Sequence, residues 1–300
     1  MFDVEAIKKQ FDGLELPNFR AYTEEEVKAK NRNSKAPFSI DTIFQSPKKI
    51  LENIKGVVFD MSNEDYHGAK EYDSSSRIKA VNISELHYKD YGKIKKSTNS
   101  MDFGSLLHDD IEHRTKTGEW KAIEEETRKT KCHTTEKAIV LHPTLHNWVL
   151  TYRKEMERHP ILSQILNKAV SEASFFYDSD DSDPDHKKKI RADAIVYEPI
   201  ENALHIFDWK YTNSFDWFHN DIKKFQYNLS AGMYSRIVSK VTGLKTFFHL
   251  VKIDAKTGLI QIVQVKYDTL LKYQELYFDA LKKIDGIDLE NPKSYDFDLI

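Results

Sequence analysis

Three segments in the second half of the chain, residues 173–178, 189–197 and 203–212, are short and rich in aromatic and β-branched residues. This composition and length are typical of β-strands. The last two segments are separated by Pro199-Ile-Glu-Asn202, and four residues is a common loop length in a β-hairpin. The sequence therefore predicts an antiparallel meander, which constrains the fold more than any other feature of the chain.

Helical periodicity surrounds this meander. We expect helices over residues 74–91, 101–113, 135–167 (broken before Pro160), 216–240 and 268–283, and a second hairpin that joins 245–254 to 259–267. The expected inward side chains are Ile78, Val81, Leu86, Phe103, Leu106, Leu107, Ile111, Ile139, Leu145, Trp148, Val149, Tyr152, Ile222, Phe225, Leu229, Met233 and Ile237. Together these elements predict one α/β domain, residues 56–300, with a mixed central sheet flanked by helices. Residues 1–55 are interpreted as an N-terminal appendage of unknown role, and residues 180–185 as a solvated acidic turn.

Composition excludes several classes of protein. With 40% hydrophobic and 31% charged residues, the chain is an ordinary globular protein. No apolar run approaches the roughly 20 residues that span a bilayer, and the start lacks the apolar core of a secretory signal, so we expect a cytoplasmic protein of a bacterial or phage-infected cell. The single cysteine, Cys132, excludes an internal disulfide and a Cys-rich metal site. A net charge of −3 argues against a simple DNA-binding module, but less against a nuclease that carries acidic metal ligands.

The hairpin places three ionisable residues together. If Glu198 faces Ala203, counting back along an antiparallel ladder sets Asp193 opposite Asp208, and Lys210 points to the same face as Asp208. Opposed like charges are destabilising unless a divalent cation lies between them, and carboxylate oxygens suit Mg²⁺ or Mn²⁺. The alternative is a surface hairpin in which Asp208 and Lys210 form an ordinary salt bridge.

Motifs distributed along the chain add to this pattern. They are Met61-Ser-Asn-Glu-Asp-Tyr-His67, Ser74-Ser-Ser-Arg-Ile78, Ser84-Glu-Leu-His-Tyr88, Gly104-Ser-Leu-Leu-His108, Glu172-Ala-Ser-Phe-Phe-Tyr177, Ile190-Arg-Ala-Asp193, Asp208-Trp-Lys210 and the segment from Gln226 to Tyr234. In this order and spacing the chain resembles the RecB/RecE-type branch of the PD-(D/E)xK nucleases, most closely the RecE-like (exodeoxyribonuclease VIII-like) exonucleases of phages. The resemblance covers residues 57–240 and implies a restriction-endonuclease-like core.

The resemblance implies roles for the matching residues. It makes His108, Asp193, Asp208 and the backbone carbonyl of Trp209 metal ligands, and Lys210 the catalytic lysine. A histidine alone on a helix is more often structural, so this role for His108 depends on the motif. Glu172 matches a glutamate that holds the metal through water or occupies a second metal site; a solvated strand end is the alternative.

The helix after the hairpin departs from the family pattern. Related enzymes carry Gln four residues before a Tyr, and here Ser230 stands at that position before Tyr234, while Gln226 lies one turn earlier. We expect Gln226 to take the catalytic role of the family's glutamine from this shifted position, since residues four apart share a helix face. Tyr227 is a candidate phosphate contact or a packing residue. Further candidates for substrate binding are Ser230, Tyr234, Arg191 and Trp217, and Trp217 or Phe218 could stack on a strand end.

The resemblance implies Mg²⁺-dependent hydrolysis of phosphodiester bonds in linear duplex DNA, in the 5′→3′ direction, during recombination or phage DNA processing. It also implies a ring-shaped homo-oligomer and a single-strand annealing protein as partner. Three alternatives stay open. They are a DNA endonuclease or nickase, a CRISPR-associated RecB-type nuclease, which normally carries four cysteines, and an inactive nuclease fold that acts as a binding module.

Overall fold

The computed structural model of the chain describes residues 38, 42–91, 99–127, 132–180, 182–212, 215 and 218–293. Its helices are α3 (Lys48–Leu51), α4 (Asn63–Gly68), α5 (Ser75–Ala80), α6 (Glu85–Lys89), α7 (Asn99–Thr117), α8 (Pro143–Arg158), α9 (Pro160–Lys168), α10 (Phe218–Lys224), α11 (Tyr227–Thr242) and α12 (Tyr267–Asp285). Its strands are β1 (Val57–Val58), β2 (Asp73–Ser74), β3 (Ala122–Glu125), β4 (His133–Thr134), β5 (Ala138–Leu141), β6 (Val170–Tyr177), β7 (Lys188–Glu198), β8 (Ala203–Tyr211), β9 (Lys245–Asp254) and β10 (Leu259–Gln264).

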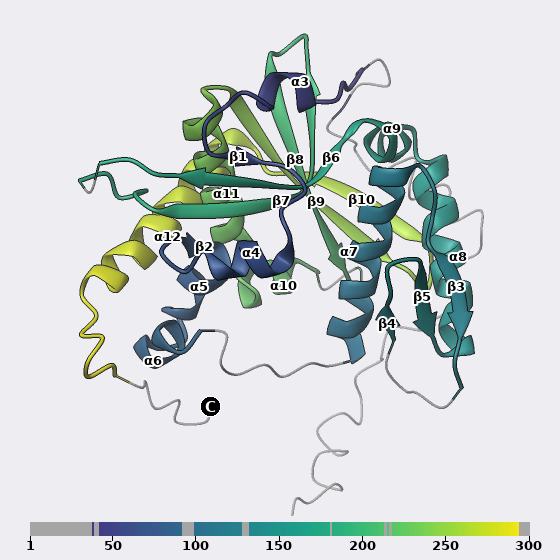
Figure 1. The fold of residues 1–300 in the computed structure, drawn as a ribbon, viewed down its shortest axis with the longest axis horizontal. Helices are drawn as coiled ribbons and strands as arrows, with labels where there is room; N and C mark the ends of the chain where they lie inside the picture. The colour runs from purple at the N-terminus through teal and green to yellow at the C-terminus, as the bar shows by residue number, and fades with distance from the viewer. Residues whose placement is uncertain are drawn as a thin grey trace, which may run out of the picture.

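In the described residues, a mixed sheet of seven strands forms the middle of the molecule (Figure 1). Its order is β1-β6-β7-β8-β9-β10, and β2 pairs with β7. The pairs β8–β9 and β2–β7 are parallel and the others antiparallel. The connection from β8 to β9 passes through α10 and α11, because parallel strands need a crossover. The predicted meander and the second hairpin are both confirmed.

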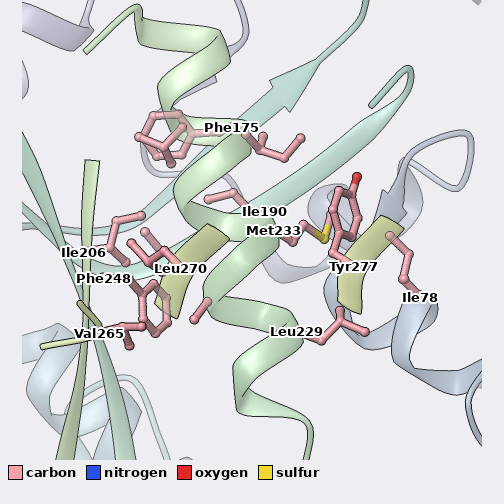
Figure 2. Packing of buried hydrophobic residues seen from close by; sticks show 14 of the residues in the cluster. Ile78, Phe175, Ile190, Ile206, Leu229, Met233, Phe248, Val265, Leu270 and Tyr277 are labelled. Atoms are coloured by element: carbon pink, nitrogen blue, oxygen red, sulfur yellow. The ribbon is translucent and has the colours of Figure 1, made fainter. Parts of the chain in front are cut away.

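Two apolar cores lie on the two sides of this sheet. One joins the sheet to α5, α11 and α12, and the other joins it to α7, α8 and α9. Figure 2 shows the first core, where side chains of α11 and α12 meet strand residues and Ile78 of α5; it labels Phe175, Ile190, Ile206, Leu229, Met233, Phe248, Val265, Leu270 and Tyr277. The central mixed sheet is therefore flanked by helices, as predicted.

Helices α11 and α12 approach each other closely at Gly232. A Cβ atom at this position would lie 2.5 Å from the backbone carbonyl carbon of Tyr273. Only glycine allows this backbone contact, so the packing of α12 onto the first core depends on residue 232.

A second, three-stranded sheet among the described residues, β3-β5-β4, corrects one prediction. Ala138–Leu141 was expected to open a helix, but it is strand β5, with Ile139 buried. A short apolar run does not by itself separate strand from helix, and its partners β3 and β4 are not visible in the local pattern. The predicted break is confirmed, since α8 ends at Arg158 and Pro160 begins α9, where a missing N–H costs nothing.

Two predicted inward residues are wrong because helices are interrupted. Leu86 is exposed, since the Ser84 side chain accepts the His87 N–H and starts a new short helix, α6, that buries Tyr88 instead. Phe225 is exposed because residues 216–240 do not form one helix: α10 ends at Lys224, and Gln226 has a left-handed backbone, φ 52°.

The acidic turn is also more than a solvated loop. Asp185 is fully buried and accepts from Arg236 Nε at 2.6 Å and from the Tyr277 hydroxyl at 2.9 Å. Lys240 Nζ lies 2.5 Å from the same carboxylate and 2.7 Å from Asp183. The turn therefore ties β6 and β7 to α11 and α12.

Residues 42–55 pack onto the domain. Phe44 is buried in the second core and Leu51 in the first, and Gln45 bridges to Tyr197 of β7. Most of segment 1–55 lies outside the described residues, so its role and its boundary remain predictions. In the part of the chain that the structure describes, no helix is long and apolar enough to cross a membrane.

Candidate active site

The β7–β8 hairpin has the predicted register. Pairs run from Glu198 opposite Ala203 to Ala194 opposite Phe207. Asp193 and Asp208 come next on the two strands. Beyond these pairs, the Trp209 backbone N–H donates to Asp193 Oδ2 at 2.9 Å. The Asp193 side chain thus accepts a hydrogen bond that a backbone carbonyl accepts in a regular strand pair. The Asp193 carboxylate is thereby held between the two strands.

The side chains of β7 change from one face of the sheet to the other at Asp193. Ile190 and Ala192 pack in the first core, but Ala194 packs in the second, which breaks the period of two. Opposite Asp193 on β6 lies Glu172, whose φ is 53°. A non-glycine residue in this conformation costs of order 1 kcal/mol, and such strain gathers at functional sites. The distortion brings a third carboxylate to the level of the other two.

His108 reaches this group from α7. Its Nδ1 lies 3.4 Å from Asp193 Oδ2. The predicted inward face of α7 (Phe103, Leu106, Leu107 and Ile111) is buried in the second core, which fixes the helix against the sheet. His108 and Asp193, two of the residues expected to share a site, are therefore in contact.

Lys210 joins the second aspartate. Its Nζ lies 2.6 Å from Asp208 Oδ2 and donates to the Trp209 carbonyl oxygen at 3.1 Å. Burial alone lowers the pKa of Lys210, but the carboxylates of Asp208 and Asp193 outweigh burial and raise the pKa above its usual value. The lysine is therefore a charged ammonium that bridges two oxygen donors.

Burial favours the protonated form of two of these carboxylates, although Arg191 Nη1 lies 3.7 Å from Glu172. Burial raises the pKa of Asp193, and Asp208 adds to the shift, although His108 and Lys210 oppose it. Burial and the neighbouring Asp193 raise the pKa of Glu172 to about 8. A further cation in this group would relieve both effects.

The candidate ligand side chains form two separate contacts rather than one cluster around a common point. Within the described ranges no three His, Cys, Asp or Glu side chains lie close enough together to hold one. His108 contacts Asp193, whereas Asp208 contacts Lys210. However, Asp208 Oδ2 and the Trp209 carbonyl oxygen already meet at one cationic group, the Lys210 ammonium. Oxygen donors of these types are those that hard divalent cations accept.

Sequence reasoning missed Lys79 on α5. Its Nζ lies 5.7 Å from the centre of the Tyr227 ring, and Lys210 Nζ lies 5.1 Å from the same ring. Burial and the charge of Lys210 lower the pKa of Lys79 to about 8. Lys79 directly follows the motif that ends at Ile78, which was the one available signal, but lysines on short helices are usually solvated.

Ser230 and Gln226, where the sequence departs from the family pattern, form hydrogen bonds with α5 and the turn after it rather than with Asp193 or Asp208. The Ser230 hydroxyl hydrogen-bonds to Ser75 at 2.8 Å, inside the protein. Gln226 accepts from Asn82 Nδ2 at 2.7 Å and donates to the Lys79 carbonyl at 3.4 Å. Both side chains therefore position α5 and its lysine beside the site.

Tyr234 packs edge-on against Phe248, with ring centres 5.9 Å apart. Burial raises its pKa well above the usual value, and the nearby Tyr66 and Asp208 raise it further. The hydroxyl thus keeps its proton near the acids.

Arg191, a predicted substrate-binding residue, is engaged by the protein. Its guanidinium donates to Asn63 at 2.6 Å, to the carbonyls of Met61 and Ser62 at 3.3 and 3.1 Å, and to Ser174 at 3.2 Å. It also lies 4.1 Å above the Tyr66 ring centre. In these contacts Arg191 anchors the first motif of the chain to the sheet.

The predicted stacking residues have different outcomes. Trp217 lies outside the described residues. Phe218 is buried in the first core, so the prediction that it stacks on a strand end is wrong.

Comparisons with known proteins bear on the fold. No protein-family model and no curated protein sequence matches the chain. A similar fold occurs in the crystal structure of a Eubacterium rectale protein named "Putative exonuclease", with a TM-score of 0.56 and 15% sequence identity over 80% of this chain and 91% of the other. At this identity the likeness shows the fold alone. The chain thus has a mixed α/β fold, with a central sheet flanked by helices, like that of a protein named as a nuclease.

Proposed function

We propose that this protein is a metal-dependent deoxyribonuclease that hydrolyses phosphodiester bonds with Asp193, Asp208 and Lys210. The observation that carries the proposal is the ammonium of Lys210, 2.6 Å from Asp208, at the level where His108 meets Asp193. The alternative of a solvated surface hairpin fits less well, because the side chains of Asp193, Asp208 and Lys210 are only 16%, 9% and 17% exposed.

The residues fit a divalent cation by the chemistry of their donors. Asp193, Asp208, the Trp209 carbonyl and His108 would hold Mg²⁺, with Mn²⁺ as a substitute. When bound, the metal would polarise a phosphate oxygen and lower the pKa of an attacking water. Glu172, opposite Asp193, is the candidate for an outer or second-metal ligand.

The side chains of the protein would supply orientation and charge. The Trp209 N–H and His108 hold the Asp193 carboxylate in one orientation before substrate arrives. The Lys210 ammonium, kept charged by the two aspartates, would stabilise the negative charge that develops on the phosphate or orient the attacking water. The ring of Tyr227, whose centre lies 5.1 Å from this ammonium, adds a favourable cation–π contact.

The substrate and polarity are part of the same proposal and depend on the family resemblance: linear duplex DNA, digested as an exonuclease from 5′ to 3′. The name of the Eubacterium rectale protein agrees with an exonuclease. A homo-oligomeric ring and a single-strand annealing partner complete the proposal. Enclosure of the product strand would let a chain of net charge −3 stay on DNA without a basic surface.

The test is digestion of end-labelled linear duplex DNA beside a covalently closed circle, in Mg²⁺ or EDTA. We expect the wild type to shorten the linear DNA from its 5′ ends and spare the circle, and Asp208→Asn to be inactive. Asp180→Asn, at an exposed acid, is the matched control and should cut normally. Cutting of the circle would favour an endonuclease, and DNA binding without any cutting would favour a binding module.

A further inference from the structure

An aromatic side chain stands exposed beside the candidate active site. Phe225 is 48% exposed, although its spacing from Leu229 and Met233 places it on the apolar stripe of a continuous helix. Its ring stacks on Tyr227, with centres 5.7 Å apart and planes at 30°. The interruption of the helix at Gln226 turns this ring out of the first core.

The interruption is held in place by the surrounding protein. Gln226 has a left-handed backbone, which costs a non-glycine residue of order 1 kcal/mol. Its side chain amide bonds Asn82 and the Lys79 carbonyl, and Asn82 in turn accepts from Lys283 Nζ at 2.7 Å. The outward position of Phe225 is therefore built into the structure.

The two rings lead from the catalytic lysine to solvent. Tyr227 lies beside Lys210 and Lys79, and Lys224 Nζ lies 5.4 Å from the centre of the Phe225 ring. Behind Tyr227, the buried Phe218 ring supports it at 6.1 Å. Aromatic faces flanked by cations bind single-stranded nucleic acid, because bases stack on the rings while ammonium groups meet phosphates.

We propose that Phe225, supported by Tyr227, is a binding site for an unpaired nucleobase of the strand whose phosphate lies at Lys210. The inference rests on the proposed DNA-cleaving function and names how the strand end is held. Stacking is tolerant of sequence, so the site takes any base. It also fills the role that the sequence suggested for Trp217 or Phe218.

The test measures binding in EDTA, where the candidate metal plays no part. The fluorescence anisotropy of a labelled oligothymidylate is compared with that of a strand of equal length without bases, which keeps the phosphates. Loss of one stacked base corresponds to a fall in affinity of about 5- to 150-fold. We expect Phe225→Ala to weaken binding of oligothymidylate by this factor and to change binding of the base-free strand by less than about twofold. Phe225→Trp should bind like wild type.

Two further variants sharpen the result. Phe225→Leu keeps an apolar side chain without an aromatic face and should behave like Phe225→Ala. Tyr267→Ala removes another exposed aromatic ring, on α12, and should bind like wild type. Circular dichroism checks that each variant is folded.

The site is overturned if the wild type shows no preference for the base-bearing strand, or if Phe225→Ala weakens both strands equally or neither. The proposed function fails by a different observation, namely that the wild type cleaves no DNA with Mg²⁺ or Mn²⁺. Cleavage with unchanged binding by Phe225→Ala would retain the function and discard the stacking site.

Discussion

Replacement of Asp185 by alanine should destabilise the protein more than any change of an exposed acid. The carboxylate is fully buried and meets Arg236, Lys240 and the Tyr277 hydroxyl. Removal of one partner from a buried ion pair costs about 3–5 kcal/mol. The side chains of Arg236 and Lys240 are 25% and 24% exposed and can turn to water, so the lower part of this range applies.

The buried Tyr277 hydroxyl determines how much stability the isosteric variant Asp185→Asn retains. Asp185→Ala leaves this hydroxyl without its acceptor, which costs about 1–3 kcal/mol within the total. Asp185→Asn keeps an oxygen there and should lose about 2 kcal/mol. We therefore expect Asp185→Ala to lower the free energy of unfolding by about 3–4 kcal/mol.

Urea unfolding followed by circular dichroism measures these differences, with Asp180→Ala as the exposed control, expected within about 0.5 kcal/mol of wild type. If Asp185→Ala fell within about 1 kcal/mol of wild type, the buried pairing would not hold in solution.

Three further predictions concern stability. The His159 Nδ1 caps α9, and burial lowers its pKa to about 4. In the unfolded chain this histidine has a pKa of about 6.5, so the unfolded chain binds the proton more readily than the folded protein. The contribution of His159 to stability is therefore complete above about pH 6.5, and stability falls by about 3 kcal/mol toward pH 4. If the free energy of unfolding of His159→Asn in urea changed with pH as much as that of the wild type, this prediction would be contradicted. Gly232→Ala should cost about 1–3 kcal/mol in the same assay, because its Cβ would meet the α12 backbone, whereas Gly68→Ala, whose Cβ meets nothing within 4 Å, should not destabilise. Arg191→Lys should lower the free energy of unfolding by about 1–3 kcal/mol, because lysine cannot replace the several hydrogen bonds of the guanidinium. The DNA affinity of the folded protein should stay unchanged. Weaker DNA binding with unchanged stability would instead support a substrate-binding role for Arg191.

The parts of the fold that follow from local period and turn length were predictable. The hairpin register needed only the four residues Pro199–Asn202 and the alternation of the strands, and the inward face of α7 needed only its helical spacing. His108, Asp193, Asp208 and Lys210 were likewise named from motifs, and the structure brings them together in two contacting pairs.

The remaining features depend on partners distant in sequence. Ala138–Leu141 is a strand because β3 and β4 pair with it, and an apolar run of four carries no period that shows this. Phe225 lies outside the core because Lys79 of α5 and Asn82, in the turn that follows α5, hold the left-handed Gln226. Asp185 is buried because cations of α11 reach it from some 50 residues away, at Arg236 and Lys240.

The most direct test of the account separates metal binding from catalysis at the candidate site. Mn²⁺ binding by calorimetry and single-turnover cleavage of linear duplex DNA are measured for the wild type, Asp208→Asn and Lys210→Met. We predict that Asp208→Asn loses both, and that Lys210→Met still binds Mn²⁺ but cleaves at least about 100-fold more slowly. Cleavage at the wild-type rate by either variant would contradict the assignment of the active site to Asp193, Asp208 and Lys210.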